Sequence, residues 1–222
     1  MKRILDWRSL TVMLVLALGV IVTCCDGNPD GGVAVDLGLP SGTLWADRNV
    51  GANSPEDCGD YFAWGETEPK NINNWSPYKW DSSLGYLKYN TKKGFGDYKI
   101  TLDPEDDAAT ANWGNAWCMP TEEQIYELAR ECTWTTTTQN GVNGFKVTGP
   151  NGKSIFLPAA GYLDHSIHRD VSDGFYWSRS LVEDKSHKAM HLHLCFYLKT
   201  CWAMASCYRS QCLTVRAVRA DN

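Results

Sequence analysis

The sequence predicts an α+β domain in which two short helices pack on short antiparallel strands joined by long loops. Only two stretches, near residues 103–114 and 121–132, carry helix start signals. From residue 133 onward, apolar and Thr-rich runs alternate with turn dipeptides, which is typical of antiparallel strands. Because helices and strands do not alternate regularly, the βαβ units of a parallel sheet are not expected.

Composition indicates one ordinary globular domain. The 222 residues are 43% hydrophobic and 21% charged, a balance that can fill one core. The formal net charge is -5, and removal of the leader described below, which carries Lys2, Arg3 and Arg8 against Asp6, leaves about -7. An acidic chain lacks the basic surface that nucleic acid requires, so no nucleic-acid partner is expected. The ten Trp and ten Tyr predict a core built on a few large rings.

The N-terminus has the layout of a secretory signal, because basic residues precede an apolar run that is too short for a comfortable membrane span. The sequence Ile21-Val22-Thr23-Cys24 resembles a bacterial lipobox. We therefore expect residues 1–23 to be a lipoprotein signal peptide and Cys24 to be lipidated. Residues 24–32, rich in Gly, Asp and Asn, would be a flexible tether. Lipidation at Cys25, and a plain signal peptide or membrane anchor, are the alternatives.

Residues 33–222 are expected to form a single domain that begins with two short strands. Residues 33–39 and 43–46 have strand composition and flank a Pro-Ser-Gly turn, and an aromatic block follows at 61–66. Residues 69–99 have no periodicity, so they are predicted to form a long loop. Five rings in this loop are expected to hold it to the core: Trp75, Tyr78, Trp80, Tyr86 and Tyr89.

Two helices are predicted from their capping residues. The first has Asp103 as its cap and Pro104 at the first helical position, and Gly114 ends it. The second is better defined, because Thr121 and Gln124 form a capping box and apolar residues recur at helical spacing after them. That second helix should pack one face on a sheet.

Three turn signals divide the chain after residue 133. The strands that they separate end with residues 154–158, and further strands are expected at 175–178 and 214–219. The turn signals are Asn140-Gly141, Asn143-Gly144 and Pro150-Asn151-Gly152.

The segment between those last two strands is an unusual mixture of His, Cys, Met, Trp, Tyr and Lys. Within it Leu192, Leu194 and Phe196 recur at period two, as in a half-buried strand. The residues that should face the other way, and be exposed, are His191, His193 and Cys195. A concentration of exposed aromatic, Met and Cys side chains in one segment indicates a binding surface.

Seven cysteines remain after the two at the lipobox. An exported chain permits disulfides, but an odd number cannot pair completely within one molecule. No CxxC is present, and the four in the C-terminal segment fit neither a zinc site nor a common disulfide framework. We interpret them as accidents of a variable surface, with room for one bridge. The seven are Cys58, Cys118, Cys132, Cys195, Cys201, Cys207 and Cys212.

Six phrases along residues 33–219 resemble one family, the Fibrobacter succinogenes major paralogous domain of Bacteroidetes lipoproteins. They are Val-Asp-Leu-Gly-Leu-Pro-Ser-Gly-Thr-Leu-Trp-Ala at 35–46, Gly-Asp-Tyr-Phe-Ala-Trp-Gly-Glu-Thr at 59–67, Trp-Cys-Met-Pro-Thr-Glu-Glu at 117–123, Phe-Leu-Pro-Ala-Ala-Gly-Tyr at 156–162, Tyr-Trp-Ser at 176–178 and Val-Arg-Ala-Val-Arg at 215–219. The resemblance implies a C-type-lectin-like fold, related to that of formylglycine-generating enzymes, with its first and last strands paired. The sequence departs from the family where Cys118 replaces Arg and where Cys212 replaces Gly, and the second change affects the final turn.

Residues 179–214 also resemble the variable region of proteins diversified by retroelements, in which selected codons are rewritten and scaffold codons stay fixed. The expected scaffold residues are Trp177, Ser178, Ser180, Leu181, Ala189, Leu192, Arg209 and Val215. The residues between them, which we call the variable positions, are the predicted ligand contacts: Arg179, His187, Met190, His191, His193, Cys195, Tyr197, Cys201, Trp202, Met204, Cys207 and Tyr208.

Other chemistry is weakly indicated. His191 and His193 could share one strand face as metal ligands do, but no third ligand is evident, so no metal is predicted. The acidic run at 105–107 is explained by the first turn of a helix rather than by calcium. A Glu-Pro pair at 68–69 is similar to that of sugar-binding lectins, but Lys70 replaces the Asn or Asp that would complete a calcium site. No cofactor is predicted.

The leading hypothesis is a surface-anchored, non-enzymatic ligand-binding lipoprotein of the outer membrane. Its membrane contact would be the lipid anchor, and its partner an unknown macromolecule, protein or glycan, bound by aromatic and Met side chains. The alternatives are a structural or adhesive envelope protein, whose segment would be packed, and an enzyme of the formylglycine-generating type. That enzyme would need paired active cysteines, and Cys207 with Cys212 do not match its motif.

Overall fold

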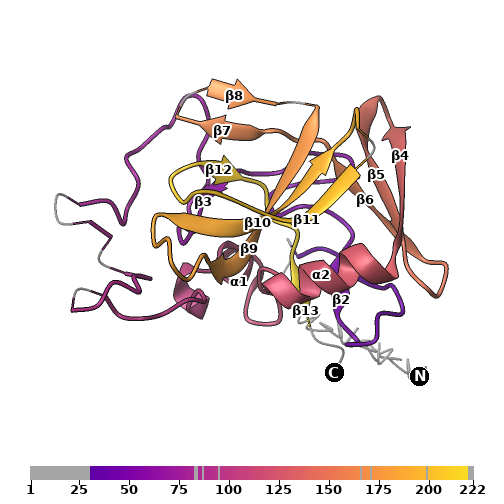
Figure 1. The fold of residues 1–222 in the computed structure, drawn as a ribbon. Helices are drawn as coiled ribbons and strands as arrows, with labels where there is room; N and C mark the ends of the chain where they lie inside the picture. The colour runs from indigo at the N-terminus through magenta and orange to yellow at the C-terminus, as the bar shows by residue number, and fades with distance from the viewer. Residues whose placement is uncertain are drawn as a thin grey trace, which may run out of the picture.

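The structure, a computed structural model, describes residues 31–82, 85–86, 88–94, 96–165, 167–170, 172–198 and 200–219. The predicted signal peptide and Cys24 lie outside the described residues. The described chain is mostly β, with four small antiparallel sheets and two short α-helices (Figure 1). No helix in this part of the chain has the length and apolar composition needed to cross a membrane.

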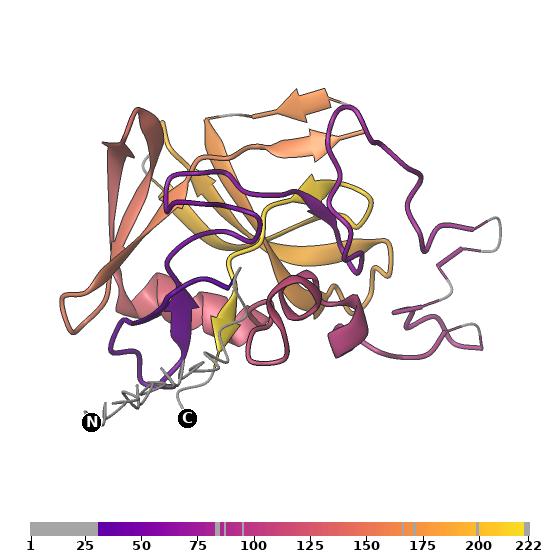
Figure 2. The same cartoon turned by 180° about the vertical axis from the view of Figure 1, so that it is seen from behind.

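The N- and C-terminal strands share one sheet, as predicted. Its order is β1 (Ala34–Asp36), β2 (Leu44–Ala46) and β13 (Val218–Arg219), and Figure 2 shows the indigo and yellow strands side by side. In β2, buried Trp45 pairs with Val35 on one side and with Val218 on the other. The strand predicted at 214–219 is shorter than expected, because its first residues bond to several separate elements instead of one partner strand.

The sheet with the most residues is formed by β9 (Asp173–Leu181), β10 (Lys188–Cys195) and β11 (Thr200–Tyr208), in the order β11–β10–β9. This sheet contains the segment that the sequence marks as unusual. Irregularities in register occur on both sides of His191 in β10. We call it the variable sheet.

A third sheet lies against one face of the variable sheet. Its order is β3 (Phe62–Ala63), β12 (Cys212–Leu213), β7 (Tyr162–Asp164) and β8 (Ile167–Arg169). Two tryptophans tie the two sheets together. The Trp177 indole N–H donates to the Phe62 carbonyl at 2.7 Å, and the Trp64 indole N–H donates to the Ser178 carbonyl at 2.9 Å.

The fourth sheet is a meander of β4 (Thr133–Gln139), β5 (Val142–Thr148) and β6 (Ser154–Pro158). Its first turn is Asn140-Gly141, with positive φ values of 48° and 84°, as a two-residue hairpin requires. The turn predicted at Asn143-Gly144 is wrong. That pair lies inside β5, where the carbonyl of Leu157 and the ring of Phe156 leave no room for a side chain at Gly144.

One of the two predicted helices forms as expected, and the other is interrupted. The capping box is confirmed: Thr121 and Gln124 cap α2 (Glu122–Glu131). The first predicted helix is broken into a 3-10 turn, η1 (Pro104–Asp106), and α1 (Ala108–Trp113). Asp107 is the reason for the break, because its buried carboxylate caps α1 by accepting from the N–H groups of Ala109 and Thr110 at 3.0 Å.

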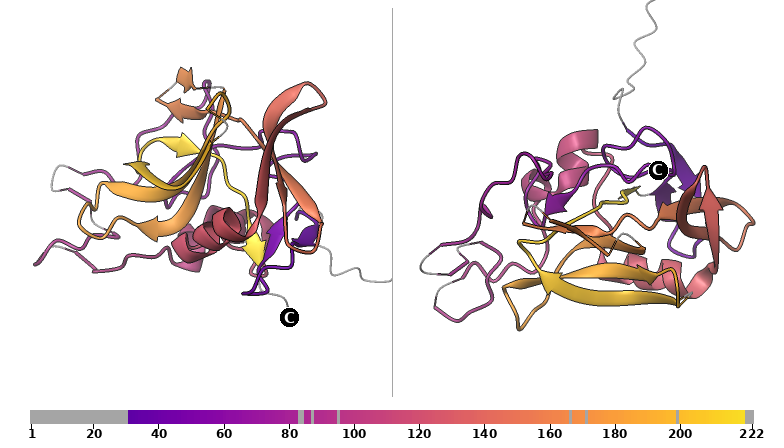
Figure 3. Two further views of the ribbon diagram at one scale, coloured as in Figure 1. Left: turned by 45° about the vertical axis from the view of Figure 1, so that its right-hand side comes forward. Right: turned by 90° about the horizontal axis from the view of Figure 1, so that it is seen from above.

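Helix α2 covers the other face of the variable sheet, and the β4–β5–β6 meander closes one end (Figure 3). Ile125 and Leu128 of α2 share a core with Leu192 and Leu194 of β10. The period-two pattern therefore identifies the helix-facing side of β10 correctly. The opposite side of the sheet packs on α1, β3 and β12 through Trp177, Leu181 and Ala189, among others.

The long loop is confirmed, since residues 64–103 contain no helix and no named strand among those described. Arg209 holds it. Its buried guanidinium donates to the hydroxyl of Tyr78 at 2.9 Å and to the carbonyls of Tyr89, Ser186 and Lys88 at 3.2, 2.9 and 3.2 Å. Four rings lie within 5.8 Å of the same guanidinium carbon: Trp64, Tyr78, Tyr86 and Tyr89.

Arg209→Lys is expected to lower the free energy of unfolding by about 3 kcal/mol, because an ammonium group cannot reach all four acceptors and leaves buried carbonyls unpaired. Urea titration measures the loss. Arg130→Lys on α2, where the side chain is 73% exposed, is the control and should change stability by less than about 0.5 kcal/mol. Equal effects of the two substitutions would mean that Arg209 does not organise the loop.

Candidate ligand-binding site

The twelve variable positions do not form one continuous exposed face. The clearest error concerns His191, which is only 4% exposed. It does point away from Leu192, as the alternation predicts, but β7 and β12 cover that side of the variable sheet. The assumption that the second face of β10 is open to solvent is therefore wrong.

Three variable positions instead meet in one pocket. His191, His193 and Cys207 line a cavity of about 310 Å³, and Asp173 and Phe175 of β9 line it too. The remaining lining residues come from neighbouring strands and turns: Tyr162, Asp170, Ala205, Ser206, Gln211 and Leu213. The pocket thus lies between the variable sheet and the sheet that contains β7 and β12. We call it the histidine pocket.

Register explains how these side chains come together. His193 pairs directly with Phe175, and Cys195 with Asp173, in the ladder between β10 and β9. The rings of His193 and Phe175 stack at 4.5 Å with an interplanar angle of 12°, and His193 Nε2 lies 3.0 Å from Asp173 Oδ2. Tyr162 meets the Phe175 ring edge-on at 5.0 Å. The result is a wall of rings with a carboxylate fixed beside it.

His191 is held differently from His193. It lies edge-on to Trp177 at 5.9 Å between ring centroids, and its Nδ1 atom is buried without a hydrogen-bond partner. Burial, reinforced by the neighbouring His193, lowers the pKa of His191 to about 3. The ring is therefore neutral at physiological pH, with one nitrogen able to accept a hydrogen bond.

Arg179 does not belong to a ligand surface in this structure. It projects to the α1 side, where its Nη2 donates to the Leu102 carbonyl at 2.8 Å and its Nε lies 3.9 Å from Asp107 Oδ2. Asp107 is fully buried, so this cation is its nearest compensating charge. Arg179 has a structural role that the sequence pattern did not reveal.

Two methionines lie on the face of the variable sheet that α2 covers. Met204 is half-buried against the core that includes Ile125 and Leu128. Met190 lines a shallow hollow beside Ile100 and Glu122. Met190 is half-buried, so only part of its side chain is available to a ligand. Met204 mainly packs against the core, so the prediction that it offers an open contact area is not supported.

The remaining described variable positions are at the surface. Tyr197 is 77% exposed at the turn between β10 and β11, and Tyr208 is 55% exposed at the end of β11. His187 is also exposed, with its ring 5.7 Å from that of Tyr208, and Cys195 is half-buried. The side chains of Cys201 and Trp202 lie outside the described part of the chain.

The six cysteines whose side chains the structure describes are unpaired thiols: Cys58, Cys118, Cys132, Cys195, Cys207 and Cys212. Burial raises the pKa of Cys207, and it raises the pKa of Cys212 to about 12. A reactive or metal-binding thiol needs a lowered pKa. These two thiols have the opposite electrostatics, which favours a packing role for both.

The two acidic regions weighed as calcium sites, near residues 105–107 and 68–70, each contain a lysine side chain that pairs with a carboxylate. The carboxylates of Asp103, Glu105 and Asp106 gather as metal ligands would, but the Lys88 ammonium contacts all three. Similarly, Lys70 Nζ lies 2.6 Å from Glu66 Oε2 in a buried ion pair. Each lysine supplies the positive charge that a bound cation would otherwise bring.

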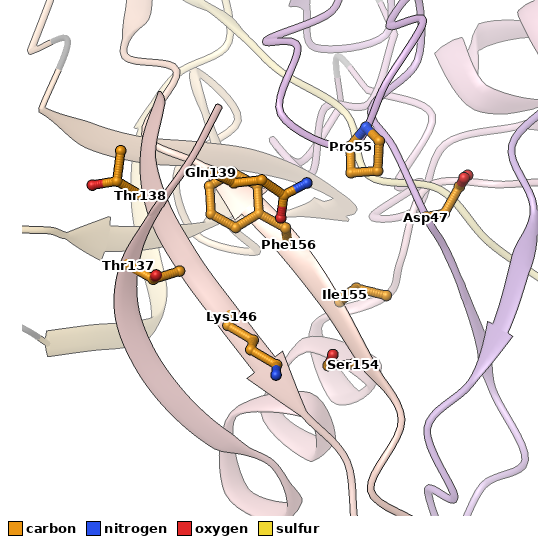
Figure 4. Close-up of a pocket in the computed structure, with 9 residues that line it drawn as sticks. All are labelled: Asp47, Pro55, Thr137, Thr138, Gln139, Lys146, Ser154, Ile155 and Phe156. Atoms are coloured by element: carbon orange, nitrogen blue, oxygen red, sulfur yellow. The ribbon is translucent and has the colours of Figure 1, made fainter. Parts of the chain in front are cut away.

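A further hollow lies far from the variable positions in sequence. It has a volume of about 390 Å³ and runs over the β4–β5–β6 meander towards Asp47 and Pro55 (Figure 4). Its wall includes Thr137, Lys146 and Ser154, and no variable position lines it. Its polar lining gives no specific ligand chemistry.

Eight of the eleven residues that line the histidine pocket were not predicted from the sequence: Tyr162, Asp170, Asp173, Phe175, Ala205, Ser206, Gln211 and Leu213. A signal for two of them was present. Asp173 and Phe175 share the alternation of Trp177 in β9, so pairing β9 with β10 would have placed them beside the histidines. The partners from β7 and the turn before β12 depend on long-range packing and leave no local signal.

Comparison with known proteins adds no identification: neither a protein-family model, nor a curated protein, nor a solved structure matches this chain.

The free energy of unfolding should fall by about 2 kcal/mol more between pH 7 and pH 5 in the wild type than in His191→Gln. The unfolded state binds a proton at His191 below about pH 6.5, whereas the folded state does not until about pH 3, so stability is lost as the pH falls through this window. Urea titrations at the two pH values measure it. The control His187→Gln, at an exposed position, should keep the wild-type pH dependence. The same pH dependence in all three proteins would show that His191 is accessible to protons.

Proposed function

We propose that this chain is a non-enzymatic ligand-binding lipoprotein, anchored to the outer membrane through Cys24 and facing the cell surface. Its scaffold is C-type-lectin-like, as the resemblance to the Fibrobacter succinogenes major paralogous domain implies. The variable sheet, including the turn that joins β10 to β11, provides the binding region, and the partner is a macromolecule, protein or glycan. Paired terminal strands, two short helices and a long loop held by aromatic rings are consistent with that scaffold.

The observation that carries the proposal is a difference in burial between the expected scaffold residues and the variable positions within residues 177–215. Seven of the eight expected scaffold residues are at most 5% exposed: Trp177, Ser178, Leu181, Ala189, Leu192, Arg209 and Val215. Of the ten variable positions whose side chains are described, three are exposed, six are half-buried and only His191 is buried. Substitution at such positions alters what the protein presents while the buried frame stays the same.

A structural or adhesive envelope protein remains the second candidate, and Met204 favours it because that side chain packs on the core. Tyr208 argues the other way. A segment that only packs would hide Tyr208, which is 55% exposed, and Tyr197 is exposed still further. Large exposed aromatic side chains contribute binding area at low cost in conformational entropy. The binding proposal accounts for them, and the structural one does not.

Tyr197→Ala and Tyr208→Ala should each weaken binding by about 10-fold or more, because such aromatic side chains dominate contact energy. The melting temperature should change by less than about 2 °C, since both residues are exposed. The wild-type domain is first tested on a glycan array and a panel of extracellular proteins, and each hit is remeasured with the variants. Tyr126→Ala, at a 47% exposed position on α2, is the control. Hits that respond equally to all three substitutions would contradict the assignment of the binding face.

Diversification of the segment makes a separate prediction. Deep sequencing of this locus in a growing population should show excess substitutions at the twelve variable positions. Codons for Trp177, Arg209 and Arg216, which are buried, should stay fixed. Codons 33–174 provide the background rate. A uniform rate across the gene would remove the retroelement part of the proposal and leave binding to be judged by the aromatic substitutions alone.

A further inference from the structure

The histidine pocket is rich in hydrogen-bond acceptors. Asp170 and Asp173 place carboxylates on its lining, and Ser206 and Gln211 add neutral oxygens. None of the lining residues that the structure describes is lysine or arginine. The charge on this lining is therefore negative.

His191 provides the independent sign that the pocket has an occupant. Its side chain is almost fully buried, yet Nδ1 has no hydrogen-bond partner. A buried polar atom left unpaired costs about 1–3 kcal/mol, so proteins rarely retain one without a reason. Because the ring is neutral, a ligand N–H group in the pocket could donate to it.

The aromatic wall adds a second preference. Tyr162 and Phe175 line the pocket beside the carboxylates, and π faces attract cations, particularly where water is excluded. A cavity of about 310 Å³ is large enough for a guanidinium or alkylammonium group with its carbon chain. An anion or an apolar group would leave the acceptors unpaired.

We propose that the histidine pocket binds a guanidinium or primary ammonium group, with Asp170 and Asp173 pairing its charge, His191 accepting from its N–H and the Phe175 wall enclosing it. This assignment deepens the proposed function, on which its biological role rests, by making a basic group the anchor of the ligand. The cation could belong to a polypeptide partner or to a free small molecule. The shared chemistry is the same in both cases.

Titration of the domain with Nα-acetyl-arginine methylamide, followed by NMR, tests the proposal directly. We expect a dissociation constant of about 1–10 mM, since the probe is a single side chain. The shifts should be centred on the ring signals of Phe175 and Tyr162 and on the imidazole nitrogens of His191. The matched citrulline compound, which is neutral and of the same shape, should bind at least about 10-fold more weakly. Equal affinity for the two compounds, or no binding by the arginine compound, overturns the proposal.

Variants locate the site and keep the test independent of folding. Asp170→Asn, at an exposed position, and Asp173→Asn should each weaken the arginine probe about 10-fold. Asp184→Asn, an exposed carboxylate that does not line the pocket, is the control and should bind normally. Retained affinity in both pocket variants would place the probe elsewhere.

Two further measurements distinguish a polypeptide ligand from a free small cation, and binding in the pocket from binding of the macromolecule at the surface. Binding by methylguanidine as tight as that by the arginine compound assigns the pocket to a free small cation, whereas clearly tighter binding by the arginine compound assigns it to a polypeptide. Loss of macromolecular binding in Tyr208→Ala without loss of probe binding shows that the surface and the pocket act separately. Probe binding with no macromolecular hit on the arrays would defeat the proposed function and leave the pocket assignment standing.

Discussion

The buried guanidinium of Arg209 is the interaction on which the rest of the structure depends. Among the residues that the structure describes it has no carboxylate partner, and its charge is stabilised by three carbonyls, one hydroxyl and four aromatic rings. These groups lie more than 100 residues away in the long loop, except for Ser186 in the turn after β9. Ordering each residue of a loop without internal sheet or helix costs about 1–2 kcal/mol of backbone entropy, and the contacts of this hub help to offset that cost. Arg209 also follows β11 directly, so the same contact fixes the end of the variable sheet.

Arg216 performs the matching task on the other side of β12. Its guanidinium donates to Asn49 Oδ1 at 2.8 Å and to the carbonyls of Ala46 and Phe156 at 3.1 and 2.8 Å. Burial lowers its pKa to about 10, so it remains charged near neutral pH. The two arginines thus fix the chain on each side of the strand that lines the histidine pocket.

Local signals predicted the elements whose causes are local. The capping box at Thr121 and the Asn140-Gly141 hairpin depend on neighbouring residues, and both appear where expected. The break at Asp107 could not be foreseen, because it depends on Met119, whose N–H also donates to that carboxylate from twelve residues away. His191 shows the same limit within the site. Alternation predicted which way its side chain points, but not that β7 and β12 would cover it. The pocket could not be predicted because the pairing of β9 with β10 and the packing of β7 against them are long-range facts.

The treatment of acidic groups elsewhere in the molecule gives the histidine pocket its significance. Asp106 contacts Lys88, Glu66 contacts Lys70, and Asp107 has Arg179 nearby, so each of the three carboxylates that the described part of the chain buries has a cation of the same chain beside it. In the pocket, Asp173 lies beside His193 instead, whose Nε2 is 3.0 Å from Asp173 Oδ2 and whose ring stacks on Phe175. The buried nitrogen of His191 adds an unpaired acceptor on the same lining. The carboxylates that the described chain buries thus each have an internal cation, whereas half-buried Asp173, exposed Asp170 and the unpaired nitrogen of His191 line one cavity beside aromatic rings, which is the chemistry of a receptor for a cation.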